Sequence, residues 1–453
     1  MNKAKLVPGL ILGCAVILWV ALTGQPTQAA DNLQWFRGQL HTHTYWSDGR
    51  AFPERAIKEY KQRGYQFLAM TDHNRFANNK GLWRKVEATE KGWPPTICQA
   101  YFDQYVETFG KEWVESKTNG LVTSVRLKTY TELKAKFEEP GKFILLPGVE
   151  ITQTVHNRGV HLNYINLPSI LPCIKGANLI KTVNETTISE IIALNALEAE
   201  QIAIEQQRPY IIMLNHPFWV YYDILPQNLI ERPEIRFFEI CNNGSSFAPN
   251  VQAQTYTVDK FWDIVNAFRL IHKHQLLYGI GSDDAHFYDP ERIKGQDAVG
   301  DAWIMVHAAT LTPKDLISAM RKGDFYASTG VLLEDVVFTS ANKTLRVKVK
   351  AEKGVHYRIQ FITTKDNFDQ SVTEISSPAG KGQRPPARTI PIYSDDIGRI
   401  VKTVEGTEAT YQLEADDLYI RARVESDSPS KITPHFHPKV KTAWTQPYTT
   451  SSH

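Results

Sequence analysis

Short apolar segments alternate with segments of helical pattern from residue 35 to about residue 330. The apolar segments are FRGQL, YQFLAMT, KFILLPG, GVHLNYIN, YIIMLN, IRFFEI, LLYGIG and AWIMV. Strands that alternate with helices are typical of a parallel sheet or barrel, because each parallel connection needs a crossover long enough to hold a helix. The alternation therefore predicts an α/β domain over residues 31–331, built on a parallel sheet or barrel.

Two segments inside this domain exceed a minimal alternation. Residues 76–140 are rich in Trp, Tyr and Phe, and residues 167–208 contain a long helical stretch that opens with Thr187 and Glu190 in capping-box spacing. Both segments are expected to be mainly helical insertions. An aromatic insertion between strands either packs against the core or forms a wall or lid over a substrate site. The sequence leaves both interpretations open.

The pattern of the chain changes after FYASTGV. The segments EDVVFTS, TLRVKVKAE, VHYRIQFITT, ATYQLE and LYIRARVES alternate apolar and polar residues and are separated by turns. A period of two is typical of half-buried antiparallel strands. Residues 332–453 are therefore predicted to form a C-terminal antiparallel β domain, similar to a β-sandwich, with a short tail.

Residues 1–30 have the pattern of a secretory signal peptide. The cationic MNKAK precedes the apolar LVPGLILGCAVILWVAL, and TQAAD offers small residues for cleavage near Ala29 or Ala30. We expect export to the periplasm or the medium, with no stable membrane span after cleavage. An uncleaved N-terminal membrane anchor is the alternative. In an oxidising compartment Cys98 and Cys173 could form a disulfide.

The charge of the mature chain is balanced. Without Lys3 and Lys5, the 51 Lys and Arg side chains of the sequence match its 49 Asp and Glu side chains. Proteins that bind nucleic acid need a basic surface, so this balance argues against a nucleic-acid partner. A small-molecule substrate is expected instead, and the sequence does not indicate an oligomeric state.

Side chains that commonly bind metals follow or interrupt six of the predicted strands. They are His41, His43, Asp48, Asp72, His73, Glu150, His161, His216, Asp283, Asp284 and His286. The carboxyl ends of parallel barrel strands meet at one end of the fold, so we expect these residues to converge. Buried carboxylates and imidazoles in such proximity are costly without cations. The pattern therefore predicts a site for more than one metal ion.

The ordered motifs HTHTYWSDG, TDHN, GVE, HP after a strand, and GSDDAH resemble those of the PHP (polymerase and histidinol phosphatase) superfamily of metallohydrolases. Within it, DFYASTGV and AWTQP resemble the carbaryl-hydrolase-like (CehA/McbA type) branch. The resemblance covers residues 35–330 strongly and the remaining chain weakly. It implies a distorted (β/α)7 TIM-like barrel that binds two to three divalent metal ions.

The resemblance also implies a set of ligands for each metal ion. The three sets are His41, His43, Glu150 and Asp284 for the first ion, Glu150, His161 and His216 for the second, and Asp48, His73 and His286 for the third. Glu150 would bridge the first two ions, and the expected catalytic residues are Glu150, Asp284 and His216. Some members have His where Asp48 stands, so the third site here can differ in occupancy or metal.

Other residues near the motifs are assigned supporting roles. Asp72 and Asp283 are expected to orient ligands by hydrogen bonds, because the Asp-x-His spacing selects Asp284 as the ligand. His156, in a polar turn, competes with His161 for the second ion and could instead contact substrate. Three arginines flank ligand segments and could neutralise a phosphate or lie solvated on the surface. They are Arg75, Arg158 and Arg292.

Nine nitrogen and oxygen ligands without a thiolate suit Zn, Mn or Fe. Two such ions can share a hydroxide, lower its pKa and clamp the oxygens of a displacement. No GxSxG motif for a serine nucleophile is present. We therefore expect an exported metal-dependent hydrolase that uses a metal-bridging hydroxide. The superfamily implies phosphomonoester or phosphodiester hydrolysis, and the branch implies aryl carbamates, esters or amides. A binding module that retains metals without turnover is a third interpretation.

Overall fold

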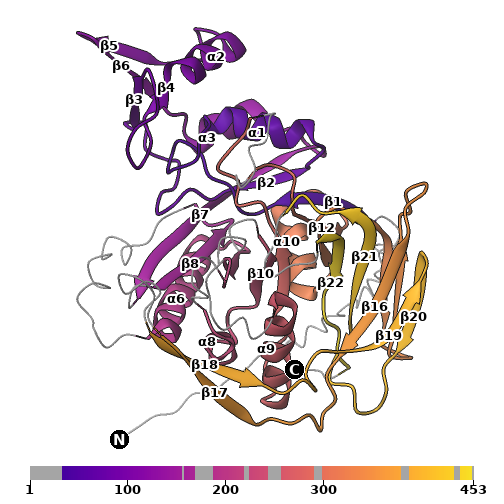
Figure 1. Ribbon diagram of the computed structural model, residues 1–453. Coiled ribbons are helices and arrows are strands. Elements are labelled where there is room, and N and C mark those ends of the chain that lie inside the picture. Colours follow the sequence, from indigo (N-terminus) through magenta and orange to yellow (C-terminus); the bar gives the residue numbers. More distant parts are fainter. Residues whose placement is uncertain are drawn as a thin grey trace, which may run out of the picture.

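The computed structural model is shown in Figure 1. It describes residues 33–155, 158–168, 187–218, 224–242, 257–289, 298–378, 387–432 and 439–450. The expected signal peptide, His156, Cys173 and Arg292 lie outside these residues. Among the helices of the described residues, none combines the length and the apolar composition of a membrane span.

A mixed sheet of 13 strands forms the centre of the molecule, in the order β11-β10-β9-β8-β7-β2-β1-β12-β13-β22-β21-β16-β19. The strands of its first part are β1 (Gln34–Gln39), β2 (Phe67–Met70), β7 (Ile144–Val155), β8 (Arg158–Ile165), β9 (Ile211–Leu214), β10 (Phe237–Cys241) and β11 (Tyr278–Gly281). β1, β2 and β7 are parallel, and so are β9, β10 and β11. β8 runs antiparallel to β7 and β9, because two residues separate it from β7 and so short a connection joins only antiparallel strands.

The second part of the sheet is antiparallel and reaches the C-terminal region. Its strands are β12 (Trp303–Ala308), β13 (Phe325–Ser328), β22 (Val440–Thr445), β21 (Arg421–Pro429), β16 (Tyr357–Thr363) and β19 (Arg399–Glu405). β22 pairs with β13, so the sheet that begins in the predicted domain 31–331 continues into the region 332–453. Strand pairing thus joins the two predicted units.

The hydrogen-bonded order of the described strands ends at β11 and at β19, so it does not confirm the expected distorted (β/α)7 barrel. A side chain pairs with the backbone of β11 at Gly279. The Gly279 N–H donates to Gln446 Oε1 (2.8 Å), and Gln446 Nε2 donates to the Gly279 carbonyl (2.9 Å). This pairing satisfies backbone groups that an open edge would leave exposed.

The helices lie on the outside of the sheet (Figure 1). They are α1 (Pro53–Gln62), α2 (Gln99–Phe109), α3 (Tyr130–Phe137), α6 (Ile188–Gln206), α8 (Pro226–Ile230), α9 (Val258–Ile271) and α10 (Pro313–Lys322). Thr187 and Glu190 form the expected capping box of α6, and Thr312 caps α10, which ends at Gly323 with φ of 84°. α9 packs its aromatic residues on β10, where Phe238 contacts Phe261 and Trp262.

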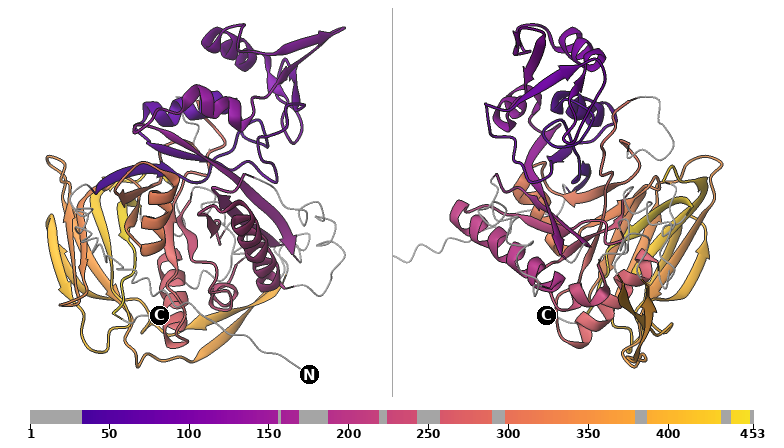
Figure 2. Two further views of the ribbon diagram at one scale, coloured as in Figure 1. Left: turned by 180° about the vertical axis from the view of Figure 1, so that it is seen from behind. Right: turned by 60° about the vertical axis from the view of Figure 1, so that its left-hand side comes forward.

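The insertion at residues 76–140 differs from the mainly helical expectation. Besides α2 and α3 it contains a sheet in the order β4-β3-β6-β5. Its strands are β3 (Trp83–Glu87), β4 (Ile97–Cys98), β5 (Ser116–Asn119) and β6 (Val122–Arg126). They are short, and all four residues of β5 are exposed, so no alternation of apolar and polar residues marks them as strands. Figures 1 and 2 show this sheet and α2 projecting from the body of the molecule, beyond α1 and α3.

Strands alone make up the regular structure of the described residues after α10. A three-stranded sheet of β14 (Leu333–Thr339), β15 (Thr344–Val349) and β20 (Glu408–Gln412) packs on β16 and β21. Leu345, Val347, Ile359, Phe361 and Val424 belong to the buried apolar cluster between the two layers. A separate ribbon of β17 (Val372–Ser377) and β18 (Arg388–Tyr393) reaches α9, where Tyr393 contacts Phe268.

Candidate metal centre

The nine predicted ligands converge at the carboxyl ends of the parallel strands. His41 and His43 follow β1, His73 follows β2, His216 follows β9, and Asp284 and His286 follow β11. Two parallel bridges beyond the regular strands draw these segments together, one between Thr42 and Ala285 and one between His73 and Glu150. Glu150 and His161 lie within β7 and β8, since these strands extend past the end of β2.

The first cluster contains His41, His43 and Asp284. His41 Nε2 lies 3.1 Å from His43 Nε2, and Asp284 Oδ1 lies 3.2 and 3.0 Å from these two nitrogens. Ligands that bind zinc tetrahedrally at 2.0–2.1 Å are about 3.3 Å apart, which is close to these three distances. Asp284 reaches this position with φ of 52°, in the left-handed region that non-glycine residues seldom adopt. Asp284, and not Asp283, is therefore the aspartate beside the histidine pair.

Glu150 lies between the first cluster and a second one, and its two oxygens face different histidines. Glu150 Oε2 lies 3.3 Å from His41 Nε2, 3.3 Å from His43 Nε2 and 2.7 Å from His73 Nδ1. Glu150 Oε1 lies 3.1 Å from His161 Nδ1 and 3.5 Å from His216 Nε2. The carboxylate is therefore placed to bridge two cations, one at each oxygen.

The third cluster combines Asp48, His73 and His286 with the outer face of His43. Asp48 Oδ2 lies 3.6 Å from His73 Nε2, and Asp48 Oδ1 lies 3.5 Å from His286 Nε2. One donor atom from each of the four residues lies within 4.8 Å of the others. These distances are longer than in the first cluster, so the third cluster is the more open of the two.

The surroundings of three carboxylate oxygens show whether metal ions would fit this centre. Within the described residues, Glu150 Oε2, Asp284 Oδ1 and Asp48 Oδ1 are buried and have no hydrogen bond of acceptable geometry. Histidine nitrogens nevertheless surround each of them at 2.7–3.7 Å. Buried oxygens without a donor are costly, and nitrogens arranged around an oxygen without a shared proton are the pattern that an intervening cation produces. The donors therefore fit divalent metal ions.

The protonation of the cluster supports the same fit. Burial acts to raise the pKa of Glu150, but the charges of His73, His41 and His161 hold it well below its usual range. Burial acts to lower the pKa of His43, but the nearby carboxylates of Asp284 and Glu150 raise it to about 10. The two carboxylates thus favour a positive charge on His43. Metal ions can take over this charge, since metal binding displaces protons from its ligands.

Asp72 and Asp283 hold the backbone around the ligands. Asp72 accepts hydrogen bonds from the backbone N–H and hydroxyl of Thr44 and from those of Ser47, at 2.7–3.0 Å. Asp283 accepts from the N–H groups of Gly300, Asp301 and Ala302 and from the Tyr60 hydroxyl, at 2.8–3.0 Å. Each aspartate fixes a turn next to a ligand segment and does not face the metal clusters.

Glu239 of β10 is a residue of the centre that the sequence analysis missed. Its Oε1 lies 2.7 Å from His41 Nδ1, on the side of the ring away from the cluster, and the carboxylate is completely buried. The His216 N–H and Asn242 Nδ2 donate to its other oxygen, at 2.6 and 2.7 Å. A carboxylate on the outer nitrogen of a metal-binding histidine fixes its tautomer and orientation. A single acidic residue within the apolar run FFEIC was the signal for this role.

The predicted substrate residues are less well placed. Arg75 is half-buried two residues after His73. Arg158 is buried at the first position of β8, and because side chains alternate along a strand it starts on the opposite face from His161. His156 and Arg292 lie outside the described residues, so their predicted contacts with substrate remain predictions.

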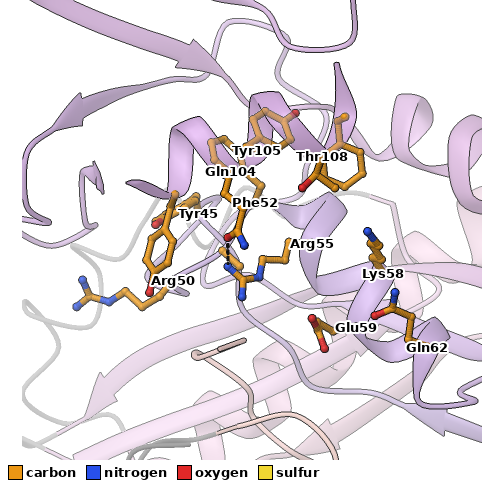
Figure 3. A pocket seen from close by; sticks show the side chains of 13 residues that line it. Tyr45, Arg50, Phe52, Arg55, Lys58, Glu59, Gln62, Gln104, Tyr105 and Thr108 are labelled. Carbon is orange, nitrogen blue, oxygen red and sulfur yellow. Dashed lines mark hydrogen bonds between the residues drawn. The ribbon is translucent and has the colours of Figure 1, made fainter. Parts of the chain in front are cut away.

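A cavity of about 190 Å³ lies between α1 and α2, next to Tyr45 and Arg50 (Figure 3). Its lining includes Tyr45, Phe52 and Tyr105, and none of the nine predicted ligands. Two arginines line it, but each already pairs with a carboxylate, Arg50 with Glu90 and Arg55 with Asp289. Lys58 and Glu59 also line the cavity, which is separate from the nine predicted ligands.

Comparisons with known proteins give distant likenesses. No protein-family model and no curated protein match the chain. Among solved structures, a two-domain protein with a predicted PHP-like metal-dependent phosphoesterase from Bacteroides vulgatus is 14% identical, with a TM-score of 0.37 over 92% of this chain and 95% of its own. A proposed metal-dependent phosphoesterase from Bifidobacterium adolescentis is 13% identical, with a TM-score of 0.29 over 57% of this chain and 90% of its own. An amidohydrolase from Chromobacterium violaceum, with bound sulfate and no metal, is 13% identical, with a TM-score of 0.27 over 55% and 87%.

Proposed function

We propose that the protein is a metal-dependent hydrolase of the PHP type, and that its substrates are phosphomonoesters or phosphodiesters. The observation that carries this proposal is the division of Glu150 between two groups of histidines, with one oxygen facing each group. A carboxylate shared in this way could serve two cations, as in two-metal hydrolases. We also propose that the protein belongs to the carbaryl-hydrolase-like branch and that its catalytic domain is a distorted barrel.

The residues of the centre have distinct roles in this proposal. His41, His43 and Asp284 would hold the first ion, His161 and His216 would hold the second, and Glu150 would be shared between them. Asp48, His73 and His286 hold a third ion. When bound, such ions polarise a phosphoryl or carbonyl oxygen and lower the pKa of water. The donor set of imidazoles and carboxylates suits Zn, Mn or Fe.

The burial of the centre favours a catalytic function over the binding of metal alone. His41, His43 and Glu150 are completely buried, whereas Asp48 and His286 reach solvent. A substrate would therefore meet the centre at one open side while the bridging carboxylate stays dry, where electrostatic interactions are stronger. A binding module without turnover would not need a buried bridging carboxylate. We therefore favour a hydrolase over a binding module.

The test is a panel of substrates on the purified protein loaded with Mn or Zn. We expect turnover of p-nitrophenyl phosphate or bis(p-nitrophenyl) phosphate, and loss of that turnover in His41→Ala. Hydrolysis of naphthyl acetate or a naphthyl carbamate alone would replace the phosphoesterase proposal with the aryl ester alternative. Turnover that His41→Ala leaves unchanged would show that the centre is not the site of reaction.

A further inference from the structure

The described ligands of the metal centre differ in their exposure to solvent. Side-chain exposure is 0% for His41, His43 and Glu150, but 16% for Asp48, 13% for His73 and 19% for His286. His161, His216 and Asp284 are 5–7% exposed, so within the described residues the third cluster is the part of the centre most open to solvent. A molecule that approaches the centre through its most exposed part passes beside Asp48.

The projecting insertion is fastened to the loop that carries Asp48. The Arg84 guanidinium donates to the carbonyl of Tyr45 at 2.7 Å and to the carbonyls of Trp46 and Ser47 at 3.2 Å. Glu90 accepts from the Tyr45 hydroxyl at 2.7 Å and from Arg50 at 2.5 Å. Because Arg84 and Glu90 both bind residues 45–50, they hold the insertion in a fixed position at the edge of the centre.

Trp93 extends from this anchored segment to Asp48. Its indole Nε1 donates to Asp48 Oδ2 at 3.2 Å, yet 73% of the residue is exposed. The turn that carries it is closed by two hydrogen bonds of 2.9 Å between Lys91 and Thr96. An exposed indole is unfavourable in water, and the hydrogen bond leaves the ring faces uncovered. The ring is therefore fixed at the open side of the centre with its apolar surface available.

We propose that Trp93 is a specificity-determining residue, an aromatic platform that stacks on a planar organic group of the substrate while the anionic or carbonyl group lies at the metal centre. This inference rests on the proposed hydrolase function. Offset stacking of two rings adds about 0.5–1.5 kcal/mol beyond simple burial, which corresponds to about a 2- to 10-fold preference for an aryl over a methyl substituent.

The test compares unreactive ligands that differ only in the substituent. Calorimetry of the metal-loaded protein with phenylphosphonate and methylphosphonate, and with benzoate and acetate, gives an aryl-to-methyl ratio of affinities for each pair. We expect Trp93→Ala to lower this ratio about 2- to 10-fold and to leave metal content unchanged. Trp93→Phe keeps a ring without the N–H and should retain most of the ratio. Leu121→Ala, at a fully exposed residue of the same insertion, is the matched control and should change nothing.

The outcomes separate this inference from the proposed function. An equal ratio in the wild type and Trp93→Ala overturns the platform, and so does a failure of all four ligands to bind. If benzoate binds with a Trp93-dependent ratio while neither phosphonate binds, the platform stands and the phosphoesterase proposal falls. A loss of metal in Trp93→Ala would show that the residue supports Asp48 and does not recognise substrate.

Discussion

The metal centre has a buried half and an open half, and the two are supported differently. The buried half, with His41, His43 and Glu150, is supported from the sheet itself. Glu239 of β10 holds the outer nitrogen of His41, and Asn215, next to β9, donates to Glu150 Oε1 at 2.8 Å. The open half is supported by the loop at residues 44–50 and by the insertion that grips it.

This difference suggests a division of labour. Side chains held by a sheet keep positions within the tolerance that catalysis demands. A rim built from an inserted segment can change without disturbing the sheet. We therefore expect the buried half to determine whether reaction occurs, and the open half to determine the third ion and the choice of substrate. The predictions below probe this division, from the largest expected effect to the smallest.

Removal of metal should affect both halves and is the largest perturbation. We expect a chelator to abolish turnover and to lower the melting temperature by about 5 °C, because ions at about 100 times their Kd contribute roughly 2.7 kcal/mol to stability. Added Zn or Mn should restore both. Differential scanning calorimetry with and without the chelator measures the shift. A melting temperature unaffected by chelator and by added metal would mean that the buried carboxylates need no cation.

His41→Ala should break the buried half alone. It removes a nitrogen that lies within 3.3 Å of His43, Glu150 and Asp284, so we expect kcat/KM to fall roughly a thousandfold as the metal's polarising contribution is lost. Mass spectrometry of the metal content should show fewer ions per chain. His272→Ala, at an exposed histidine after α9, is the matched control and should retain activity. Turnover at the wild-type level in His41→Ala would contradict the role of the buried half.

Sequence patterns predicted the members of the centre better than its surroundings. His41, His43, His73 and His216 stand out because each follows an apolar run, and the structure brings all four together. Glu239 could not be recognised in the same way. An acid within a strand reveals its partner only when the neighbouring strands are placed, and that placement depends on long-range pairing.

Sequence patterns predicted the topology of the sheet less well, for a related reason. The pairing of β22 with β13 joins residues more than a hundred positions apart, and local alternation carries no information about such partners. The strands of the insertion were missed because propensity is a weak guide to short, exposed strands. The start of helix α6 was predicted well, since its capping box is a local signal.

Glu239→Gln tests whether the sheet supports the buried half through the contact of Glu239 with His41. The change keeps the shape of the side chain but removes the charge that faces His41 Nδ1. We expect metal affinity to fall about 10- to 100-fold, as is usual when the outer partner of a metal-binding histidine is altered. Competition with a chromogenic chelator measures this affinity, and saturating metal should restore most of the turnover. Glu334→Gln, at an exposed residue of β14, should have no effect. Unchanged affinity in Glu239→Gln would show that His41 is oriented without this carboxylate.

Asp48→Asn should produce the smallest change, because it alters only the open half. Asparagine has nearly the same shape as aspartate but lacks the negative charge that lies between His73 and His286. We expect one metal ion to be lost per chain while the buried pair remains, with kcat/KM reduced about tenfold by the loss of one charged contact. Asp369→Asn, at an exposed residue after β16, controls for charge. If Asp48→Asn emptied the whole centre, the two halves would be one cooperative unit, and the division between chemistry and selectivity would be wrong. Retention of the buried ions with altered preference among esters would instead place selectivity in the open half, beside Trp93.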